Sequence, residues 1–279
     1  MPALSKEILV STAHSTSPGT AIITGASSGI GKVYAERLAA RGYDVVLVAR
    51  RADRLRQMAD DLQTRFAIQA DVLVADLSTT SGVAAVVERL DRDPGVSMLV
   101  NNAGFSIFKP LADTPEAVIT SMIALNITAL TKLSKAALVA FTAKGSGSLV
   151  NIGSGAGFAP FPGIPIYGAT KAYVYLLTQS LQSEVKDTGV HVQLVLPGAV
   201  LSEGWDVAGG ADHEPLPESV VMTAEDCVDA ALAGLDQKEF VTAPSLHDEA
   251  DFRNYEAASA TLLQSMFDAE PASRYGLSR

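Results

Sequence analysis

Short apolar, β-branched runs alternate with longer helix-like segments along most of this 279-residue sequence. The run "DVVLVAR" has strand length, whereas the preceding "GIGKVYAERLAARG" has helical spacing and ends in glycine. Such alternation predicts parallel strands joined by crossover helices. The runs that predict strands are "TAIITG", "DVVLVAR", "AIQADVLVADL", "SMLVNNAG", "GSLVNIGS", "VHVQLVLPG" and "EFVTA". We therefore predict an α/β fold with a doubly wound parallel sheet of about seven strands and helices on both faces.

The segments between these runs predict helices at 29–42, 52–65, 82–93, 115–144, from 165 or 167 to 186, and 224–235. We predict a flexible N-terminal extension at 1–18, with no signal peptide, and one domain over 19–279. Residues 199–222 are rich in glycine, proline and acidic residues, which predicts a mobile substrate loop. Residues 247–268 place apolar side chains at helical spacing. That face is interpreted as packing on the core or on another subunit, and a substrate role is the alternative.

The composition, with 48% hydrophobic and 19% charged residues, indicates a globular protein. A net charge of −10 argues against general nucleic-acid binding, which needs a basic face. Cys227 is the single cysteine and is interpreted as a buried small hydrophobe; no internal disulfide is possible, which fits a reducing compartment. No apolar run approaches the length of a membrane span, so a cytoplasmic protein without membrane contact is predicted. No metal site is predicted, because the histidines are scattered at His14, His191, His213 and His247.

A glycine-rich turn, "TGASSGIG", joins the first predicted strand to the first helix. Gly25, Gly29 and Gly31 permit a tight turn, and the helix N-terminus offers unpaired N–H groups to a phosphate. The position in a doubly wound chain favours dinucleotide binding over an unliganded turn. A Walker-type loop is disfavoured, because Lys32 is followed by Val33 and not by Ser or Thr.

The second predicted strand ends in Arg50 and Arg51, where an acidic residue in such folds would bind the ribose 2′-hydroxyl of NAD. Asp44 lies at the wrong end of that strand, and Asp53 already belongs to the following helix. An arginine at this position can bind a 2′-phosphate through charge-assisted hydrogen bonds. We therefore predict NADP(H) in preference to NAD(H); two solvated arginines at a helix start are the alternative.

The stretch "YGATK" places Tyr167 and Lys171 four residues apart, on one face of a predicted helix. A cation beside a tyrosine favours its phenolate and lowers its pKa from about 10. Tyr167 is thereby a candidate acid/base with Lys171 as its partner. Two residues at this spacing are a weak motif alone, and the rest of the chain has to support it.

Taken together, these motifs resemble the short-chain dehydrogenase/reductase family, in its single-domain Rossmann branch, over roughly residues 20–245. The resemblance rests on "TGASSGIG", "ADL" at 75–77, "NNAG" at 101–104, Asn126, Ser154 thirteen residues before Tyr167, "YGATK", and "PG" at 197–198. The family often has another serine before the catalytic one, where this chain has Gly153. It often has threonine at the fourth residue after "PG", where this chain has Ser202, which keeps the hydroxyl.

The resemblance implies a catalytic tetrad made of Asn126, Ser154, Tyr167 and Lys171. In it, Ser154 would bind the substrate oxygen, and Asn126 would hold a water that relays protons to Lys171. It implies that Asp76 binds the adenine amino group with Leu77 nearby, and that "NNAG" borders the cofactor, with Asn101 also packing structurally. The implied cofactor-binding residues are Gly25, Ser27, Ser28, Gly29, Ile30, Gly31, Arg50, Arg51, Asp76, Leu77, Asn102, Ala103, Gly104, Tyr167, Lys171, Pro197, Gly198, Val200 and Ser202.

The predicted function is NADP(H)-dependent interconversion of a ketone or aldehyde and an alcohol by hydride transfer, with Tyr167 as general acid/base. A 3-oxoacyl-thioester reductase and a catalytically weak dinucleotide-sensing protein are the alternatives; a sugar epimerase or dehydratase is disfavoured by the glycine spacing. A hydrophobic substrate is expected, with ordinary packing as the other interpretation of the aromatic residues near the site. Those residues are Phe105, Phe108, Phe158, Phe161 and Trp205. The family resemblance also implies a homodimer or homotetramer.

Overall fold

A computed structural model describes residues 17–201 and 216–277 of the chain; residues 1–16, 202–215 and 278–279 lie outside the described part. The chain divides into two compact units between Pro244 and Ser245, and each is described by itself. The predicted organisation into an extension at 1–18 and one domain over 19–279 stays a prediction.

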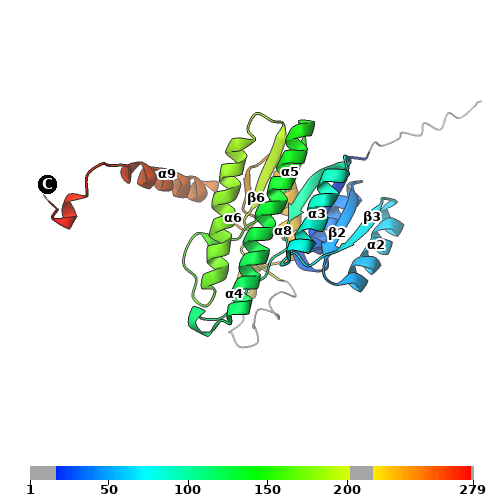
Figure 1. The fold of residues 1–279 in the computed structure, drawn as a ribbon, viewed down its shortest axis with the longest axis horizontal. Helices are drawn as coiled ribbons and strands as arrows, with labels where there is room; N and C mark the ends of the chain where they lie inside the picture. The colour runs from blue at the N-terminus through cyan, green and yellow to red at the C-terminus, as the bar shows by residue number, and fades with distance from the viewer. Residues whose placement is uncertain (1–16, 202–215, 278–279) are drawn as a thin grey trace, which may run out of the picture. The chain divides into compact units, whose positions relative to one another are not determined.

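Strands and helices alternate through the first unit as predicted (Figure 1). The strands are β1 (Thr20–Thr24), β2 (Asp44–Ala49), β3 (Ala70–Val74), β4 (Val96–Asn101), β5 (Gly147–Ile152), β6 (Val190–Val195), β7 (Ala199–Val200), β8 (Val221–Met222) and β9 (Val241–Thr242). The helices are α1 (Gly29–Ala40), α2 (Ala52–Phe66), α3 (Thr80–Arg92), α4 (Glu116–Ile123), α5 (Leu130–Lys144), α6 (Pro165–Glu184) and α8 (Ala224–Asp236).

A seven-stranded parallel sheet forms the centre of this unit, in the order β3-β2-β1-β4-β5-β6-β9. The predicted Rossmann-type sheet is therefore confirmed. The strand order reverses between β1 and β4, and ligands of open α/β sheets bind at the carboxyl ends of the strands beside such a reversal. The turns that follow β1 and β4 begin at Gly25 and Asn102, so the two predicted cofactor motifs lie at this switch point.

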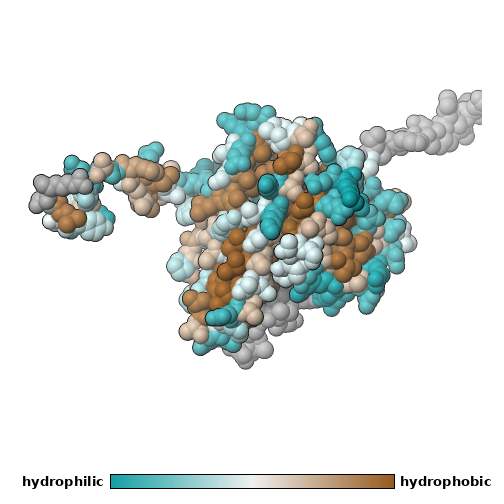
Figure 2. Space-filling view, viewed as in Figure 1, coloured by the Kyte–Doolittle hydropathy of each residue, from teal (hydrophilic) through white to brown (hydrophobic). Residues whose placement is uncertain are grey.

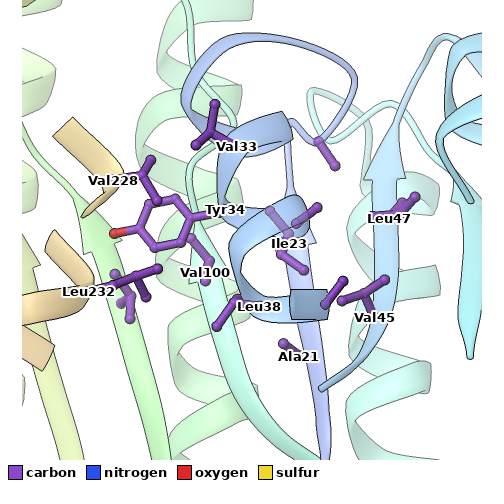
Figure 3. Close-up of a cluster of buried hydrophobic side chains, with 14 of the residues drawn as sticks. Ala21, Ile23, Val33, Tyr34, Leu38, Val45, Leu47, Val100, Val228 and Leu232 are labelled. Atoms are coloured by element: carbon purple, nitrogen blue, oxygen red, sulfur yellow. The ribbon is translucent and has the colours of Figure 1, made fainter. Parts of the chain in front are cut away.

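Alternate side chains of each strand enter two separate hydrophobic cores. Ile23 of β1 packs in the core formed with α1, α2 and α8, whereas its neighbour Ile22 packs in the core formed with α3, α5 and the end of α6. The first core is shown in Figure 3, where the ring of Tyr34 points from α1 towards Val228 and Leu232 of α8. Both faces of the sheet are thus covered, which explains why the strand sequences are apolar throughout.

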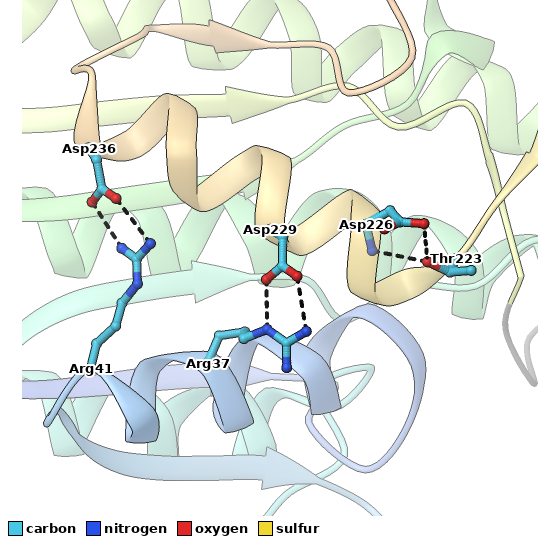
Figure 4. A network of polar contacts seen from close by, with 6 residues as sticks. All are labelled: Arg37, Arg41, Thr223, Asp226, Asp229 and Asp236. Atoms are coloured by element: carbon cyan, nitrogen blue, oxygen red, sulfur yellow. Dashed lines mark hydrogen bonds and ion pairs between the residues drawn. The ribbon is translucent and has the colours of Figure 1, made fainter.

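Two ion pairs join the outer sides of α1 and α8 (Figure 4). Arg37 donates from Nε to Asp229 Oδ1 at 2.6 Å and from Nη2 to Oδ2 at 3.0 Å. Arg41, at the end of α1, donates from Nη1 to Asp236 Oδ1 at 2.9 Å and from Nη2 to Oδ2 at 3.0 Å. Because these contacts are bidentate, they fix the two helices relative to each other more closely than single surface contacts would.

The predicted helix at 115–144 is continuous from Glu116 to Lys144, but its middle is the π-helical turn η2 (Ala124–Ala129). Within the described residues, this one helix is long and apolar enough to cross a membrane by length and composition, a test that no segment was expected to meet. One third of its most apolar window (33%) is buried. Helices that pack on a sheet pass the same test, and here Leu133 and Phe141 are buried against β4 and β5.

The predicted substrate loop at 199–222 begins and ends in paired strands. Val200 of β7 lies opposite Met222 of β8, and the next residue, Leu201, donates its N–H to the Met222 carbonyl at 2.9 Å. Two residues per strand are too few for a pattern of alternation, so this pairing is not predictable from the sequence.

The second unit contains the helix α9 (Glu249–Ser265), which begins at the cap residue Asp248 and confirms a helix within the predicted range 247–268. None of the helical residues is buried. The apolar residues Leu262, Leu263, Met266 and Phe267 are all more than half exposed, Phe267 by 80%. The interpretation that this face packs on the core or on another subunit stays a prediction.

Candidate active site

The glycine turn after β1 is held against the turn after β4. Gly25 has φ +69°, and a Cβ on Gly31 would lie 2.4 Å from the Gly25 carbonyl oxygen, so a side chain at either position disrupts the turn. The Asn102 amide donates to the Thr24 carbonyl at 2.9 Å from the other side. These contacts bring "TGASSGIG" and "NNAG" together, as the resemblance implied.

Thr24, for which no role was predicted, connects these two turns. Its buried hydroxyl donates to the Val100 carbonyl at 3.1 Å and accepts from the N–H groups of Asn102 and Ala103 at 2.9 and 3.0 Å. The hydroxyl therefore links the carboxyl end of β1 to the carboxyl end of β4. The signal in the sequence is its place as the first residue of "TGASSGIG", but the predicted contacts there were assigned only to later residues of the motif.

The N-terminus of α1 has the features of a phosphate site. The N-cap residue, Ser28, is extended, and its side chain makes no capping hydrogen bond to the helix. No acidic side chain lies in the first turn. The backbone N–H groups of this turn are thus left for an anion, whose charge the helix dipole also favours. The tight turn and the uncapped helix fit a dinucleotide pyrophosphate.

Of the two predicted arginines, Arg51 lies on the glycine turn. Its guanidinium donates to Ser27 Oγ at 2.9 Å and to Ser28 Oγ at 2.7 Å. Arg50 is exposed, and its charge acts on Asp76. The structure therefore brings a cation and two hydroxyl groups together beside the α1 N-terminus, a suitable donor set for a 2′-phosphate.

Asp76 and Leu77 come shortly after β3, the strand that lies on the opposite side of β2 from β1. One carboxylate oxygen of Asp76 accepts from the Ser78 hydroxyl at 2.7 Å and from the Ser78 N–H at 2.9 Å. These hydrogen bonds, with a smaller contribution from Arg50, hold the pKa of Asp76 below its ordinary value. Asp76 is therefore ionised and oriented, whereas Leu77 is buried in the hydrophobic core.

Ser154, Tyr167 and Lys171 meet where β5 ends and α6 begins. Ser154 Oγ accepts from the Ala156 N–H at 3.1 Å, which leaves its own hydrogen for the Tyr167 phenol oxygen. The Lys171 ammonium lies 5.6 Å from the centroid of the Tyr167 ring. The predicted trio is thus assembled from two elements.

Burial controls the ionisation of both titratable groups in this trio. It raises the pKa of the Tyr167 phenol, and the hydrogen bond from Ser154 offsets part of that rise. This direction is opposite to the predicted lowering by Lys171, because the loss of solvation disfavours the phenolate more strongly than the hydrogen bond from Ser154 favours it. Burial also lowers the pKa of Lys171 to about 8. At neutral pH the phenol is therefore protonated, which is the form that donates a proton.

Asn126 lies in the π-helical turn η2 and joins three segments. Its Oδ1 accepts from the Phe105 N–H at 3.1 Å, and its Nδ2 donates to the Phe105 carbonyl at 3.0 Å and to Thr170 Oγ1 at 3.1 Å. The side chain is 2% exposed. Both amide N–H groups are engaged, so the side chain holds the loop after β4 against α6; the water relay stays a prediction.

The predicted residues after β6 are only partly described. The Pro197 carbonyl accepts from the Gly155 N–H at 2.9 Å, which places "PG" beside the turn after Ser154, and Val200 belongs to β7. Ser202 and Trp205 lie outside the described residues.

The aromatic residues that were predicted near the site lie in different environments. The ring of Phe158 meets Tyr175 of α6 edge-on at 5.0 Å between centroids, which favours the packing interpretation for this residue. The loops that carry Phe108 and Phe161 are joined by the Lys109 N–H and the Gly163 carbonyl, at 2.6 Å. Phe161 is 51% exposed, so it is the aromatic residue of the two loops most open to a ligand.

Comparison with known proteins decides the family, because residues 19–209 match the family described as short chain dehydrogenase. The chain is a short-chain dehydrogenase/reductase. This family assignment covers every described site residue named above, from Thr24 to Val200. It confirms the resemblance, and with it the assignment to a family of oxidoreductases.

Two solved structures resemble this short-chain dehydrogenase over more than nine tenths of its length. One, from Sphingobium yanoikuyae in complex with NADPH, is 44% identical, covers 92% of this chain and 99% of its own, and has a TM-score of 0.88. The other, the bulky-bulky ketone specific alcohol dehydrogenase from Comamonas testosteroni, is 41% identical, covers 93% and 99%, and has a TM-score of 0.85.

Among curated relatives, the human very-long-chain 3-oxoacyl-CoA reductase is 34% identical over 208 residues. The alignment covers 73% of this short-chain dehydrogenase and 66% of the human protein. The chain thus spans just under two thirds of the length of that relative.

Proposed function

We propose that the protein is an NADPH-dependent carbonyl reductase, which also oxidises the corresponding alcohol. The arrangement of Ser154, Tyr167 and Lys171 carries this proposal, since it places a protonated phenol between a hydrogen-bond donor and a buried cation. The NADPH complex of the Sphingobium relative supports the choice of cofactor. The bulky-bulky ketone specific relative supports a ketone as substrate.

Each side chain of the trio has one step in the reduction. A reduced nicotinamide, when bound here, would supply the hydride that the carbonyl carbon accepts. When the substrate binds, the Ser154 hydroxyl would turn its one hydrogen from the Tyr167 phenol to the substrate oxygen and stabilise the negative charge that develops there. Tyr167 transfers its phenol proton to that oxygen, and the Lys171 ammonium stabilises the phenolate that remains. In alcohol oxidation the same groups act in reverse.

The cofactor is proposed to bind along the switch point between β1 and β4. The uncapped N-terminus of α1 would bind the pyrophosphate, and Arg51 with Ser27 and Ser28 would bind the 2′-phosphate. Asp76 is ionised and can accept a hydrogen bond from the adenine amino group. This donor set favours NADP(H) over NAD(H).

Reduction of a 3-oxoacyl thioester is the second candidate, and the similarity to the human reductase is the observation that favours it. One assay separates the two. The purified protein is incubated with NADPH or NADH and with a panel of bulky diaryl or aryl alkyl ketones, small ketones and 3-oxoacyl thioesters. Turnover of the ketones with NADPH supports the proposal. Turnover of thioesters alone supports the second candidate, and tight NADPH binding without any turnover favours a dinucleotide-sensing protein.

A homodimer or homotetramer is proposed as the assembled form, in the cytoplasm. Apolar side chains gather along α5 and α6 on the face shown in Figure 2, and Val139 and Leu176 are each 62% exposed. Burying such side chains between copies would stabilise an oligomer. Light scattering on the full chain and on a Val139→Asp, Leu176→Asp variant tests this: the wild type should have at least twice the monomer mass, and the variant should lose it.

A further inference from the structure

Thr170, between Tyr167 and Lys171 in "YGATK", is almost fully buried, at 1% exposure. Its hydroxyl lies 2.8 Å from the Tyr167 carbonyl and 3.1 Å from Asn126 Nδ2. A hydroxyl has one hydrogen to donate, and a carbonyl can only accept, so the Tyr167 carbonyl takes that hydrogen. Thr170 Oγ1 must then accept from Asn126.

The same reasoning fixes the orientation of the Asn126 amide. The Phe105 N–H can only donate, so the amide atom that faces it is Oδ1, and Nδ2 points to Thr170. The direction of each of these hydrogen bonds therefore depends on that of the next. Together they connect the loop after β4, through the π-helical turn η2, to the first turns of α6, which carry Tyr167 and Lys171.

α6 contains a second threonine in the same chemical situation. Thr178 is 0% exposed, donates to the Val174 carbonyl at 2.6 Å and accepts from Asn151 Nδ2 at 3.0 Å. Both hydroxyls bond a carbonyl of the preceding turn and one asparagine amide. They differ in their partners, because only Thr170 touches two residues of the proposed catalytic tetrad.

We propose that Thr170 is a positioning residue, which sets the Asn126 amide and holds the Tyr167 phenol and the Lys171 ammonium in their working geometry. This inference rests on the proposed reductase function. Replacement by valine keeps the shape but removes the hydroxyl, and leaves one Asn126 N–H without its partner. The first turns of α6 and the loop at Phe105 can then separate, and small displacements of catalytic groups reduce rates strongly.

Three variants test this role: Thr170→Val, Thr170→Ser and the matched control Thr178→Val. With NADPH and the best ketone of the panel, Thr170→Val should lose about 10- to 100-fold in kcat with KM within about threefold of wild type. Thr170→Ser should recover kcat to within about threefold, since it restores the hydroxyl. Thr178→Val should lose comparable stability in urea unfolding and keep kcat within about twofold.

A readout without substrate separates this proposal from the reductase assignment. The tyrosinate absorbance of each variant is titrated against its Tyr167→Phe counterpart, which isolates the Tyr167 phenol. In Thr170→Val the phenol should titrate at least about half a pH unit closer to its ordinary value, because the loosened turn admits water. Thr178→Val should titrate like wild type.

Two results would overturn the positioning role: a Thr170→Val enzyme with kcat within about twofold of wild type, or equal kcat losses in the two valine variants at equal stability. If the wild type reduces no carbonyl compound, the reductase function fails. In that case an unchanged Tyr167 titration in Thr170→Val would overturn the positioning role separately.

Discussion

The ammonium nitrogen of Lys171 lies 2.8 Å from the carbonyl oxygen of Ile152, the last residue of β5. Lys171 is 7% exposed, and this carbonyl orients a cation that has given up most of its water. The charged form is disfavoured by burial, which is why the pKa of Lys171 falls to about 8. Keeping Lys171 charged beside the Tyr167 ring therefore destabilises the folded protein.

The lowered pKa of buried Lys171 predicts that the free energy of unfolding depends on pH. Between pH 8 and 10.5 the unfolded chain binds a proton at Lys171 that the folded chain does not bind, so stability rises with pH across this window. Relative to a Lys171→Met variant, the free energy of unfolding of the wild type should increase by about 2 kcal/mol from pH 7 to pH 9.5. Urea unfolding at several pH values measures this. Lys135→Met, which removes an exposed lysine, is the control; a Lys171→Met difference that stays flat with pH would contradict the buried cation.

Removal of the phenol hydroxyl in Tyr167→Phe should reduce kcat for ketone reduction by about 10²- to 10⁴-fold, because this variant lacks the group proposed to donate the proton. Ser154→Ala should lose about 10²- to 10³-fold through the unstabilised oxyanion. Stopped-flow measurement of NADPH oxidation, with fluorescence titration of NADPH binding, separates chemistry from cofactor affinity. Binding should stay within about threefold of wild type. Near-wild-type turnover in Tyr167→Phe would remove this residue from the mechanism.

Cofactor preference should depend on Arg51 more than on Arg50, since Arg51 is the arginine on the glycine turn. Arg51→Ala is expected to weaken NADPH binding by about 10- to 100-fold and NADH binding by less than about threefold, because only NADPH carries the 2′-phosphate. Arg50→Ala and Arg50→Asp are the matched variants on the neighbouring residue, and their effects should be smaller. Equal losses of NADPH and NADH binding would indicate damage to the glycine turn. A ratio of NADPH to NADH affinity that stays unchanged in every variant would contradict the assignment of these arginines to the 2′-phosphate.

The ion pair between Arg37 and Asp229 should contribute modestly to stability. The side chains are 36% and 53% exposed, so a double-mutant cycle with Arg37→Ala and Asp229→Ala should give a coupling free energy of about 0.5–1 kcal/mol at low salt. The exposed pair Arg56–Asp53 within α2 serves as control, with a coupling near zero. Raising the salt concentration should shrink the Arg37–Asp229 coupling, and a coupling that is insensitive to salt would point to packing instead of charge.

The sequence predicts the sheet and the positions of the site motifs because both depend on local patterns. A β-branched run ending in glycine identifies β1, and the spacing of Ser154, Tyr167 and Lys171 identifies the trio. The family match then confirms the fold. The choice between Arg50 and Arg51 needs the structure, because adjacent residues leave a strand end in directions that the sequence does not specify.

Long-range polar contacts are beyond prediction from one sequence. The Arg37–Asp229 pair spans 192 residues, and neither residue stands in a distinctive pattern. The rise in the pKa of Tyr167 was likewise missed, because i, i+4 spacing gives the neighbour of the phenol but not its burial. Thr24 and Thr170 were passed over for a similar reason: threonine is common, and only its partners distinguish it.

The π-helical turn at Ala124–Ala129 means that the helix from Glu116 to Lys144 contains one residue more than its flanking faces require. Loss of a single residue there, such as Thr128, would close the wide turn while α4 keeps its side towards α6 and α5 keeps its side towards the sheet. The fold would tolerate this shortening, whereas the hold of Asn126 on Phe105 and Thr170 would be lost. At this point of the chain, a change in length by one amino acid therefore alters the chemistry without altering the architecture.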